Sequence, residues 1–315
     1  MASCAGVPGD PPAPPWEAGA FGEHVLAGRV FAPAEGRFVA PAEAVQRLAS
    51  ADFVLLGEKH DNPDHHRLQA WLLARLIASG RRPALVMEMI DVDRSEVVSA
   101  YLRAHPDDVD GLGEALRWSA GGWPSWDMYR PIIEAAVSAG LPLAPGNLPR
   151  AVARGLARGE AGAKAGIRNL GLEKDPPPEV AAAMAEEIRE SHCRLLPDSA
   201  IAPMVLAQRA RDAQLAAVMA TPRPGLDGAV LIAGAGHVRS DRGVPARLRE
   251  TAPGRSILAL AFLEVDPEKD APAAYAASFA AASPPFDLLW FTPRLEENGD
   301  PCGKLADDLK KRPAK

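Results

Sequence analysis

The chain has 315 residues, with 35 Lys and Arg against 41 Asp and Glu, and 47% of its residues are hydrophobic. A chain of this length buries about three quarters of the surface that it exposes when unfolded, so it can fold on its core alone. The net charge of −6 argues against a nucleic-acid-binding protein, which needs a clustered excess of Lys and Arg. No apolar stretch approaches the roughly 20 residues that cross a bilayer.

The N-terminal segment has a composition of its own. Residues 6–20 are rich in proline and poor in large apolar side chains, which favours a tether; we expect one over residues 1–22. Cys4 follows two small residues, as a cysteine does at the end of a bacterial lipoprotein signal, but the basic and apolar regions of such a signal do not precede it. Cys4 is therefore either incidental, or a lipid-attachment site whose true start codon lies upstream. A basic tail is expected over residues 306–315.

The other cysteines are Cys193 and Cys302, so the total is odd and no C-x-x-C spacing occurs. This pattern predicts neither a disulfide framework nor a zinc knuckle.

A strand, a loop and a helix are predicted over residues 52–79. Residues 52–57 form a short apolar run that ends in glycine, which is typical of a strand buried on both faces. In the polar segment that follows, Asn62 suits a helix N-cap and Pro63 the first helical position. Apolar residues then recur at helical spacing, so the segment indicates the opening of a βαβ unit.

The same pattern continues along the chain. Further strands are expected over residues 84–89, 141–144, 229–233, 256–265 and 286–291. Between them lie two long helical stretches, around residues 94–120 and 149–220, which exceed what simple crossovers need. The sequence therefore predicts an α/β domain over residues 23–305, with a mostly parallel sheet flanked by helices and a smaller helical subdomain.

Polar residues follow several of the predicted strands. Ligands gather at the carboxyl ends of the strands in open α/β sheets, so we expect these residues to meet at one edge. They are Glu58, His60, Glu88, Asn147 and His237.

Glu88 has apolar neighbours on both sides, and an unpaired buried carboxylate costs several kcal/mol. It must be protonated, paired or bound to a ligand, and an ion pair with Lys59 or a contact with a helix amide is the plain structural explanation. For His60 and His237 the equivalent explanation is an imidazole that orients a loop. His65 and His66 fall in the first helical turn, so we expect one to face inward and the other to face solvent.

Three chemistries remain open for this set. Two imidazoles and two carboxylates can bind a metal ion, but no H-E-x-x-H or other short signature occurs, and we predict no metal. General acid–base hydrolysis is possible, with His60 or Glu88 activating water. Nucleophilic catalysis is disfavoured because the chain has no G-x-S-x-G elbow, and residues 234–237 lack the third glycine of a dinucleotide-binding loop.

Residues 55–69 (LLGEKHDNPDHHRLQ) and 234–245 (GAGHVRSDRGVP) resemble the ChaN-type iron-regulated haem-binding lipoproteins. Shorter matches support the resemblance by their order and spacing, which together cover about residues 26–303. These are residues 123–131, 147–149, 191–193, 208–212, 291–293 and 300–302.

The resemblance implies a lipid-anchored protein of the cell envelope that serves haem or iron uptake. It further implies a homodimer with haem bound as a face-to-face pair between the subunits, a tyrosinate ligand to iron, and basic or imidazole groups on the propionates. The chain has three tyrosines, Tyr101, Tyr129 and Tyr275. Tyr129 lies in a family-like motif and is the predicted ligand, although a buried tyrosine that donates one hydrogen bond would fit equally well. The predicted haem contacts are Tyr129, His60, His65, His66, Arg130 and His237.

The wider superfamily includes hydrolases similar to erythromycin esterase and to Tiki. They share a Glu-x-His motif after the first strand, and Glu58, His60, Glu88 and His237 match their constellation. We therefore expect a haem-binding lipoprotein, with haem and a second copy of the chain as partners. A hydrolase that uses these four residues is the alternative, and an interaction module is a third reading. Without the lipid anchor, the expected location is the cytoplasm.

Overall fold

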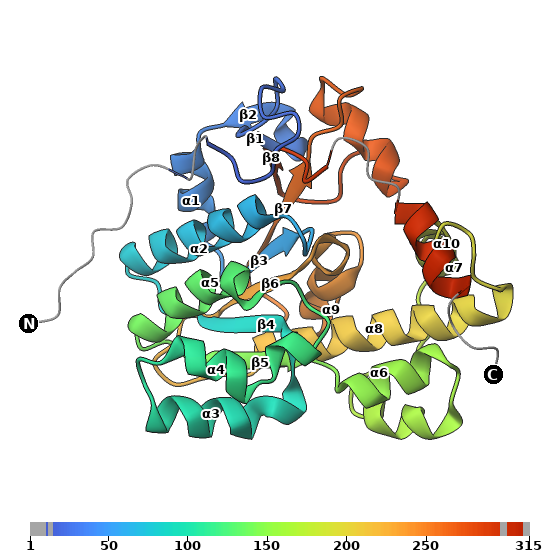
Figure 1. Cartoon of the computed structure of the whole chain (residues 1–315), viewed down its shortest axis with the longest axis horizontal. Coiled ribbons are helices and arrows are strands. Elements are labelled where there is room, and N and C mark those ends of the chain that lie inside the picture. The colour runs from blue at the N-terminus through green and yellow to red at the C-terminus, as the bar shows by residue number, and fades with distance from the viewer. Residues whose placement is uncertain (1–10, 12–14, 297–300, 311–315) are drawn as a thin grey trace, which may run out of the picture.

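A computed structural model describes residues 11, 15–296 and 301–310, and within them one mixed sheet is covered by helices on both faces (Figure 1). The strands are β1 (Val30–Ala32), β2 (Arg37–Val39), β3 (Phe53–Glu58), β4 (Ala84–Asp91), β5 (Leu143–Asn147), β6 (Ala229–Gly234), β7 (Ile257–Glu264) and β8 (Leu288–Thr292). The helices are α1 (Pro41–Ala49), α2 (Pro63–Ala78), α3 (Ser95–Ala104), α4 (Val109–Ala115), α5 (Trp126–Ser138), α6 (Arg150–Ala157), α7 (Pro178–Ser191), α8 (Asp198–Ala220), α9 (Gly243–Thr251) and α10 (Pro301–Lys310). The short 3-10 helices are η1 (Pro33–Glu35), η2 (Val92–Arg94), η3 (Trp118–Ala120), η4 (Ala161–Ile167), η5 (Ala235–Val238) and η6 (Pro272–Phe279).

The strand order is β2-β1-β8-β7-β3-β6-β4-β5. Strand β3 lies in the middle and pairs in parallel with β6 and β7, while β4 pairs in parallel with β5 and β6. The antiparallel pairs are those that β1 forms with β2 and with β8. The prediction of an α/β fold with a mostly parallel sheet is confirmed.

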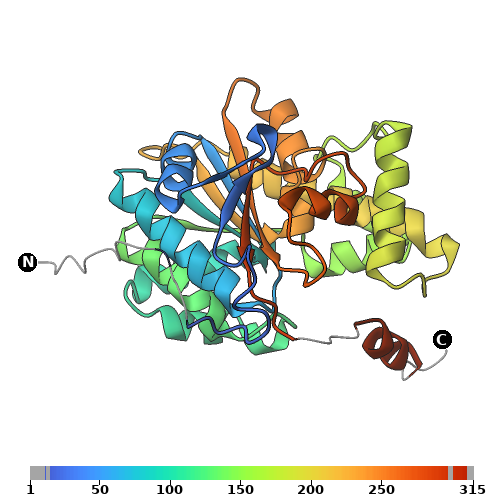
Figure 2. The same ribbon diagram turned by 90° about the horizontal axis from the view of Figure 1, so that it is seen from above.

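Strand β3 illustrates how the sheet is buried on both faces. Val54 and Leu56 point to the side of α2 and α5, whereas Phe53 and Leu55 point to the side of α8 and α9. Figure 2 shows these helix pairs on opposite sides of the sheet. Because successive side chains of a strand alternate between faces, a strand covered on both must be apolar throughout. This is why the run over residues 53–56 has no polar residue.

The predicted helical subdomain has a small core of its own. This core joins α6, η4 and the N-terminal half of α8, and consists of Leu148, Leu156, Ile167, Ala207 and Ala210. Further along α8, Leu215 and Met219 pack on the sheet. Helix α8 therefore runs from the subdomain to the sheet as one rigid element. Among the described helices, none is both long and apolar enough to cross a membrane.

The strands β1 and β2 and the helix α1, which precede β3, were not predicted. Each of the two strands has only three residues, and Gly36 makes the connection between them with a φ of +63°. Three residues are too few for a recognisable alternation of apolar and polar side chains.

Residues 17–20 contact the rest of the protein although they fall within the tether predicted over residues 1–22, and residues 1–10 and 12–14 lie outside the described part. The amides of Glu17 and Ala18 donate hydrogen bonds to the carboxylate of Asp64 in the first turn of α2, and Ala20 forms a β-bridge with Arg294. A composition poor in apolar residues did not prevent packing here, because the backbone donates these hydrogen bonds and the indole of Trp16 lies against Gly28. At the other end, α10 includes the first half of the predicted basic tail, and residues 311–315 lie outside the described part.

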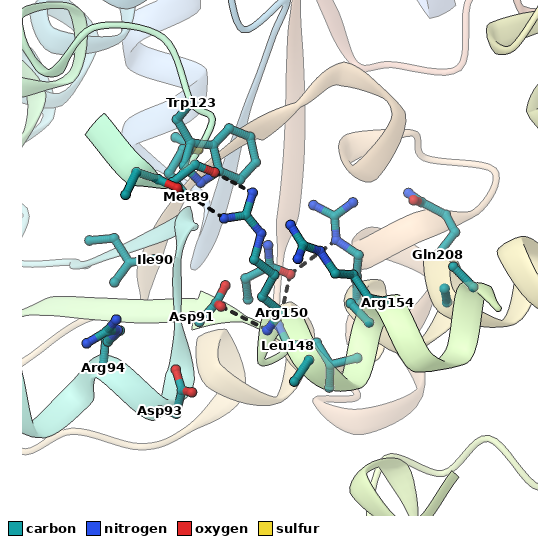
Figure 3. A pocket seen from close by; sticks show the side chains of 18 of the residues that line it. Met89, Ile90, Asp91, Asp93, Arg94, Trp123, Leu148, Arg150, Arg154 and Gln208 are labelled. Atoms are coloured by element: carbon teal, nitrogen blue, oxygen red, sulfur yellow. Dashed lines mark hydrogen bonds between the residues drawn. The ribbon is translucent and has the colours of Figure 1, made fainter. Parts of the chain in front are cut away.

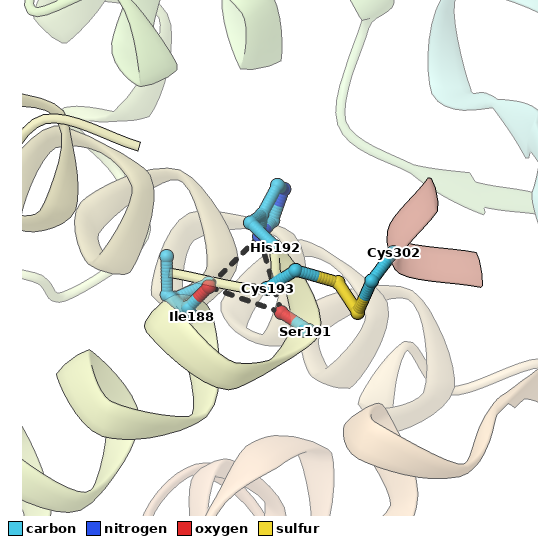
Figure 4. The surroundings of a disulfide bond; sticks show 5 residues. All are labelled: Ile188, Ser191, His192, Cys193 and Cys302. Atoms are coloured by element: carbon cyan, nitrogen blue, oxygen red, sulfur yellow. Dashed lines mark hydrogen bonds between the residues drawn. A yellow bond between two sulfur atoms is a disulfide. The ribbon is translucent and has the colours of Figure 1, made fainter. Parts of the chain in front are cut away.

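A disulfide bond between Cys193 and Cys302 corrects the prediction that the cysteines form none. It joins the end of α7 to the start of α10 (Figure 4). The two residues are 109 positions apart in sequence, a separation that matches no short cysteine motif. Cys4 lies outside the described residues.

Candidate functional site

The carboxyl ends of β3, β6 and β4 lie side by side, and the polar residues at these ends meet there. Glu58 is the last residue of β3, Glu88 lies near the end of β4, and His237 lies in η5 directly after β6. The loop after β3 carries His60 to the same place. The structure thus brings these four residues together.

Glu58 is the centre of one half of this cluster and is buried. Its Oε1 accepts hydrogen bonds from the Tyr129 hydroxyl and from Nδ1 of His60, each over 2.8 Å. Its Oε2 lies 3.2 Å from Nδ1 of His66. Burial alone would raise the pKa of Glu58, but the charge of His66 and the hydrogen bonds lower it to about 2. Glu58 is therefore an anion held by three side chains.

His66 is the second histidine in contact with Glu58. Its Nε2 donates a hydrogen bond to the backbone carbonyl of His60 over 2.9 Å. Burial acts to lower the pKa of His66, but the charge of Glu58 raises it above its ordinary value. This rise favours the protonated ring, whose Nδ1 faces the carboxylate of Glu58 in a buried pair.

The neighbouring His65 is neutral. Its Nδ1 accepts from the Lys59 amide over 2.9 Å, and its Nε2 donates to the Thr292 hydroxyl over 2.8 Å. Burial lowers the pKa of His65 to about 3. The expectation that one of His65 and His66 faces solvent is wrong, because the start of α2 is covered by the loop after β3 and by the end of β8. Both side chains are buried, and neither lines the two cavities described below.

Tyr129 is fully buried, and its ring packs against His66 and Trp118. Burial raises the pKa of its phenol well above the ordinary value, and the charge of Glu58 raises it further. The hydroxyl thus stays protonated and donates to Glu58. The next residue, Arg130, points elsewhere and forms ion pairs with Asp110 and Glu134 on the surface of the helical layer. The structure places Tyr129 in the cluster but leaves Arg130 outside it.

Glu88 is the centre of the other half. It is buried and accepts hydrogen bonds from the Arg211 guanidinium and, over 2.7 Å, from the Gly234 amide. Burial acts to raise the pKa of Glu88, yet the charges of His237 and Arg211 hold it well below its ordinary value. The carboxylate is paired, as expected, but its partner is not Lys59, which instead contacts Glu264.

His237 lies between two carboxylates. Its Nδ1 is 2.6 Å from Oδ1 of Asp212, and its Nε2 is 3.4 Å from Oε1 of Glu88. Burial alone would lower the pKa of His237, but the charges of Glu88 and Asp212 raise it to about 9. His237 is therefore a cation at neutral pH.

Three residues of α8 that complete the site were missed as site residues: Gln208, Arg211 and Asp212. Gln208 lies 3.1 Å from Nδ1 of His237, and Arg211 also donates to Asn147 over 3.2 Å. Their spacing of three and four residues places them on one face of the helix, which is the signal that sequence reasoning could have used.

His60 is the most accessible member of the cluster, with 35% of its side chain exposed. Its Nε2 lies 4.0 Å from Oε2 of Glu88, and its ring meets that of Trp123 edge to face. A Cβ atom at Gly234 would come within 3.0 Å of Nε2, so glycine leaves the space for this ring. Burial acts to lower the pKa of His60, but the hydrogen bond to Glu58 and the charge of Glu88 raise it.

Two cavities open at this edge of the sheet. The smaller, of about 240 Å³, is lined by His60, Glu88 and His237 among others. The larger, of about 830 Å³, lies between η2, η3, α6, α7 and α8. Four residues line both cavities and form a shared wall: Ile188, Ser191, Gln208 and Arg211.

The larger cavity combines apolar and cationic surface. Its apolar lining includes Met89, Leu116, Trp118, Trp123, Leu148 and Met204. Its charged lining consists of five arginines, Arg94, Arg117, Arg150, Arg154 and Arg211, against Asp91 and Asp93. Figure 3 shows Arg150 beneath Trp123, with Arg94 and Arg154 to either side.

These surfaces favour different chemistry. The small cavity offers a histidine oriented by a carboxylate next to a second, cationic histidine, which suits acid–base chemistry. The larger cavity suits an amphipathic anion with a broad apolar face. No group of three or more His, Cys, Asp or Glu side chains among the described residues is arranged to hold a metal ion.

Comparison with known proteins places the chain in a family. Residues 44–248 match the family model described as haem-binding uptake, Tiki superfamily, ChaN. A solved structure described as cofacial haem binding to ChaN of Campylobacter jejuni aligns with a TM-score of 0.62 and 16% identity, over 83% of this chain and 95% of that one. An erythromycin esterase EreC mutant in its open conformation aligns with a TM-score of 0.47 and 13% identity, over 82% and 94% of the respective chains. No curated protein matches by sequence. Since the family model covers more than half of the chain, the protein belongs to the ChaN family of haem-binding uptake proteins in the Tiki superfamily.

Proposed function

We propose that the protein binds haem in the larger cavity and serves haem or iron uptake. Membership of the ChaN family supports haem as the ligand, and the similar structure of ChaN from Campylobacter jejuni is described as binding haem. The observation that carries the proposal for this chain is the lining of the larger cavity, which combines tryptophan and methionine side chains with arginines.

The residues of the larger cavity fit haem in shape and charge. A volume of about 830 Å³ lies within the range of roughly 300–1,000 Å³ that is usual for cofactor pockets. Trp118 and Trp123 offer apolar surface to a flat macrocycle. Arg94 and Arg154 have no ion-pair partner among the described residues, so their guanidinium groups are available to the two propionates. When bound, haem would supply its iron chemistry; the chain supplies the apolar walls and the positive charge.

A haemin titration tests this proposal. We expect a Soret shift that saturates near one haemin per chain, and an affinity at least tenfold lower in the double variant Arg94→Glu, Arg154→Glu. Arg103→Glu is the matched control, since Arg103 is exposed and pairs with Glu96 outside the cavity. No Soret shift at stoichiometric haemin would refute the proposal.

We extend the proposal to the assembly and the location. Haem in a cavity that opens at the surface can be shared by two copies of the chain, so haemin is expected to promote dimerisation, which sedimentation velocity with and without haemin would detect.

The disulfide between Cys193 and Cys302 fits an oxidising compartment such as the cell envelope. Lipid attachment at Cys4 is tested by metabolic labelling of the protein expressed from its genomic locus with a palmitate analogue; a Cys4→Ser variant that labels equally would contradict it.

A hydrolase is the second candidate function, and the small cavity is the observation that favours it. Nδ1 of His60 donates to Glu58, which directs Nε2 toward the cavity as the position of a general base. Cationic His237 and Arg211 would stabilise negative charge that develops nearby. Hydrolysis of an ester panel by the wild type that is abolished by His60→Asn would support this candidate, and absence of hydrolysis by the wild type would count against it.

A further inference from the structure

The identity of the iron ligand can be approached through the side chains that the fold leaves free to act as one. Protein ligands to haem iron come from His, Cys, Met or Tyr. Each of the three tyrosines has an internal partner: Tyr129 donates to Glu58, Tyr101 donates to Asp108 over 2.6 Å, and Tyr275 accepts from the Asp266 amide over 2.7 Å. None of them lines the larger cavity.

Protonation also opposes a tyrosinate. The hydrogen bond to Asp108 raises the pKa of Tyr101 to about 12, and burial raises the pKa of Tyr275 above its ordinary value. The pKa of the Tyr129 phenol is raised further still, by burial and by the charge of Glu58. A tyrosinate ligand would have to form against these shifts and, at Tyr129, would also break a buried hydrogen bond.

His192 is the histidine that lines the larger cavity. It follows α7 directly as its C-cap residue, and its Nδ1 lies 2.8 Å from the backbone carbonyl of Ile188. A carbonyl oxygen only accepts, so the proton of the neutral ring must be on Nδ1. The lone pair of a neutral His192 is therefore on Nε2.

This arrangement is the one that a metal-binding histidine needs. A histidine that binds a metal through one nitrogen usually donates its other N–H to a carbonyl or carboxylate, which fixes the tautomer and the ring orientation. Nε2 of His192 has no hydrogen-bond partner among the described residues, and the ring points away from the disulfide and from the axis of α7 (Figure 4).

Two neighbours hold this histidine in place. Cys193 is bonded to Cys302, so the backbone directly after His192 is covalently fixed. The hydroxyl of Ser191 lies 3.1 Å from Nδ1 and also donates to the carbonyl of Ile188 over 3.2 Å. By contrast, His60 and His237, the other histidines near the cavities, are bound to carboxylates through Nδ1.

We infer that Nε2 of His192 is the axial ligand to the iron of haem bound in the larger cavity, in place of a tyrosinate. This inference rests on the proposed function and assigns a ligand within it. The arginines that line the same cavity would then hold the propionates, while the indoles of Trp118 and Trp123 line the apolar part.

The test compares haemin with metal-free protoporphyrin IX. His192→Ala is expected to weaken haemin binding at least tenfold and to move the Soret band, while the affinity for metal-free protoporphyrin IX, followed by fluorescence, stays within twofold of the wild type. Free imidazole at millimolar concentration should restore the Soret position in His192→Ala. His105→Ala is the matched control, since His105 also ends a helix but lines neither cavity.

Each outcome separates the inference from the proposed function. If His192→Ala binds haemin with unchanged affinity and spectrum, the assignment of His192 as the ligand is overturned and the proposed function stays intact. The same holds if Tyr129→Phe alone loses the wild-type spectrum. A wild type that binds no haemin overturns both. Thermal melts of each variant show whether it is folded, and His192→Gln, which keeps a polar side chain at this position, replaces His192→Ala if the latter does not fold.

Discussion

Oε1 of Glu58 accepts hydrogen bonds from both Tyr129 and His60, so a buried hydroxyl and a solvent-accessible imidazole share one carboxylate oxygen. Nδ1 of His66 lies 3.2 Å from the other oxygen of the same carboxylate. The position of His60 at the small cavity therefore depends on a group that is itself inaccessible.

Glu58→Gln is expected to lower the free energy of unfolding by about 3–5 kcal/mol, because it leaves the buried cation of His66 without its partner. Tyr129→Phe removes one neutral donor and is expected to cost about 0.5–1.5 kcal/mol. Urea denaturation followed by circular dichroism measures both. A cost for Glu58→Gln no larger than that for Tyr129→Phe would show that the ion pair with His66 does not form.

The pH dependence of stability should have two limbs. The pKa of His237 is raised to about 9 in the folded state, so its contribution is complete below its ordinary pKa near 6.5 and is lost as the pH rises through 9. The pKa of Glu58 is lowered to about 2, so its contribution is complete above 4.5 and is lost as the pH falls through 2. The pKa of His65 is lowered to about 3, so protonation of this histidine in the unfolded state also reduces stability below pH 6.5. Melting temperatures should therefore be highest near pH 6.5. His237→Gln should flatten the alkaline limb alone, and an unchanged alkaline limb would contradict the assignment.

Gly57→Ala should destabilise the fold by about 1–3 kcal/mol, because the new Cβ would lie 2.3 Å from the side chain of Val238 and 3.0 Å from the backbone of Ala235. Val238→Ala in the same chain should recover part of this loss, which a double-mutant cycle would measure. Gly162→Ala is the control, since a Cβ there meets nothing within 4 Å. Equal melting temperatures for Gly57→Ala and Gly162→Ala would be inconsistent with the close packing of β3 on η5.

Replacing Cys193 and Cys302 together by serine should lower stability by about 2–4 kcal/mol and expose α10 to proteases. Peptide mapping without reduction should recover the two cysteine-containing peptides as one linked species, and limited proteolysis should show earlier loss of the C-terminal segment in the variant. Recovery of both cysteines as free thiols from protein purified under oxidising conditions would contradict the bond.

The sheet and its polar edge could be predicted because their signals are local. The run over residues 53–56 is apolar throughout, since both faces of β3 are buried, and the polar segment with Glu58 and His60 follows it directly. The carboxyl ends of parallel strands then meet by geometry alone.

The rest of the site depends on how elements pack. Arg211 and Asp212 reach Glu88 and His237 only because α8 crosses the sheet in one orientation, and the same spacing would also suit a solvated helix face. The burial of His65 likewise depends on Thr292 of β8, 227 residues away in sequence. Tyr129 was identified through its motif, but whether its hydroxyl faces a ligand or Glu58 is decided by tertiary packing.

The wall shared by the two cavities makes their occupants interdependent. The guanidinium of Arg211 faces Glu88 in the small cavity and also lines the large one, with Gln208 beside it. A ligand in either cavity that draws Arg211 toward itself changes the charge that the other cavity presents. Thermodynamic linkage then requires the effect to be equal in both directions: if a small carboxylic acid weakens haem binding by some factor, haem weakens the binding of that acid by the same factor. In the proposed function, release of haem from the larger cavity would then respond to a small molecule that never contacts the haem.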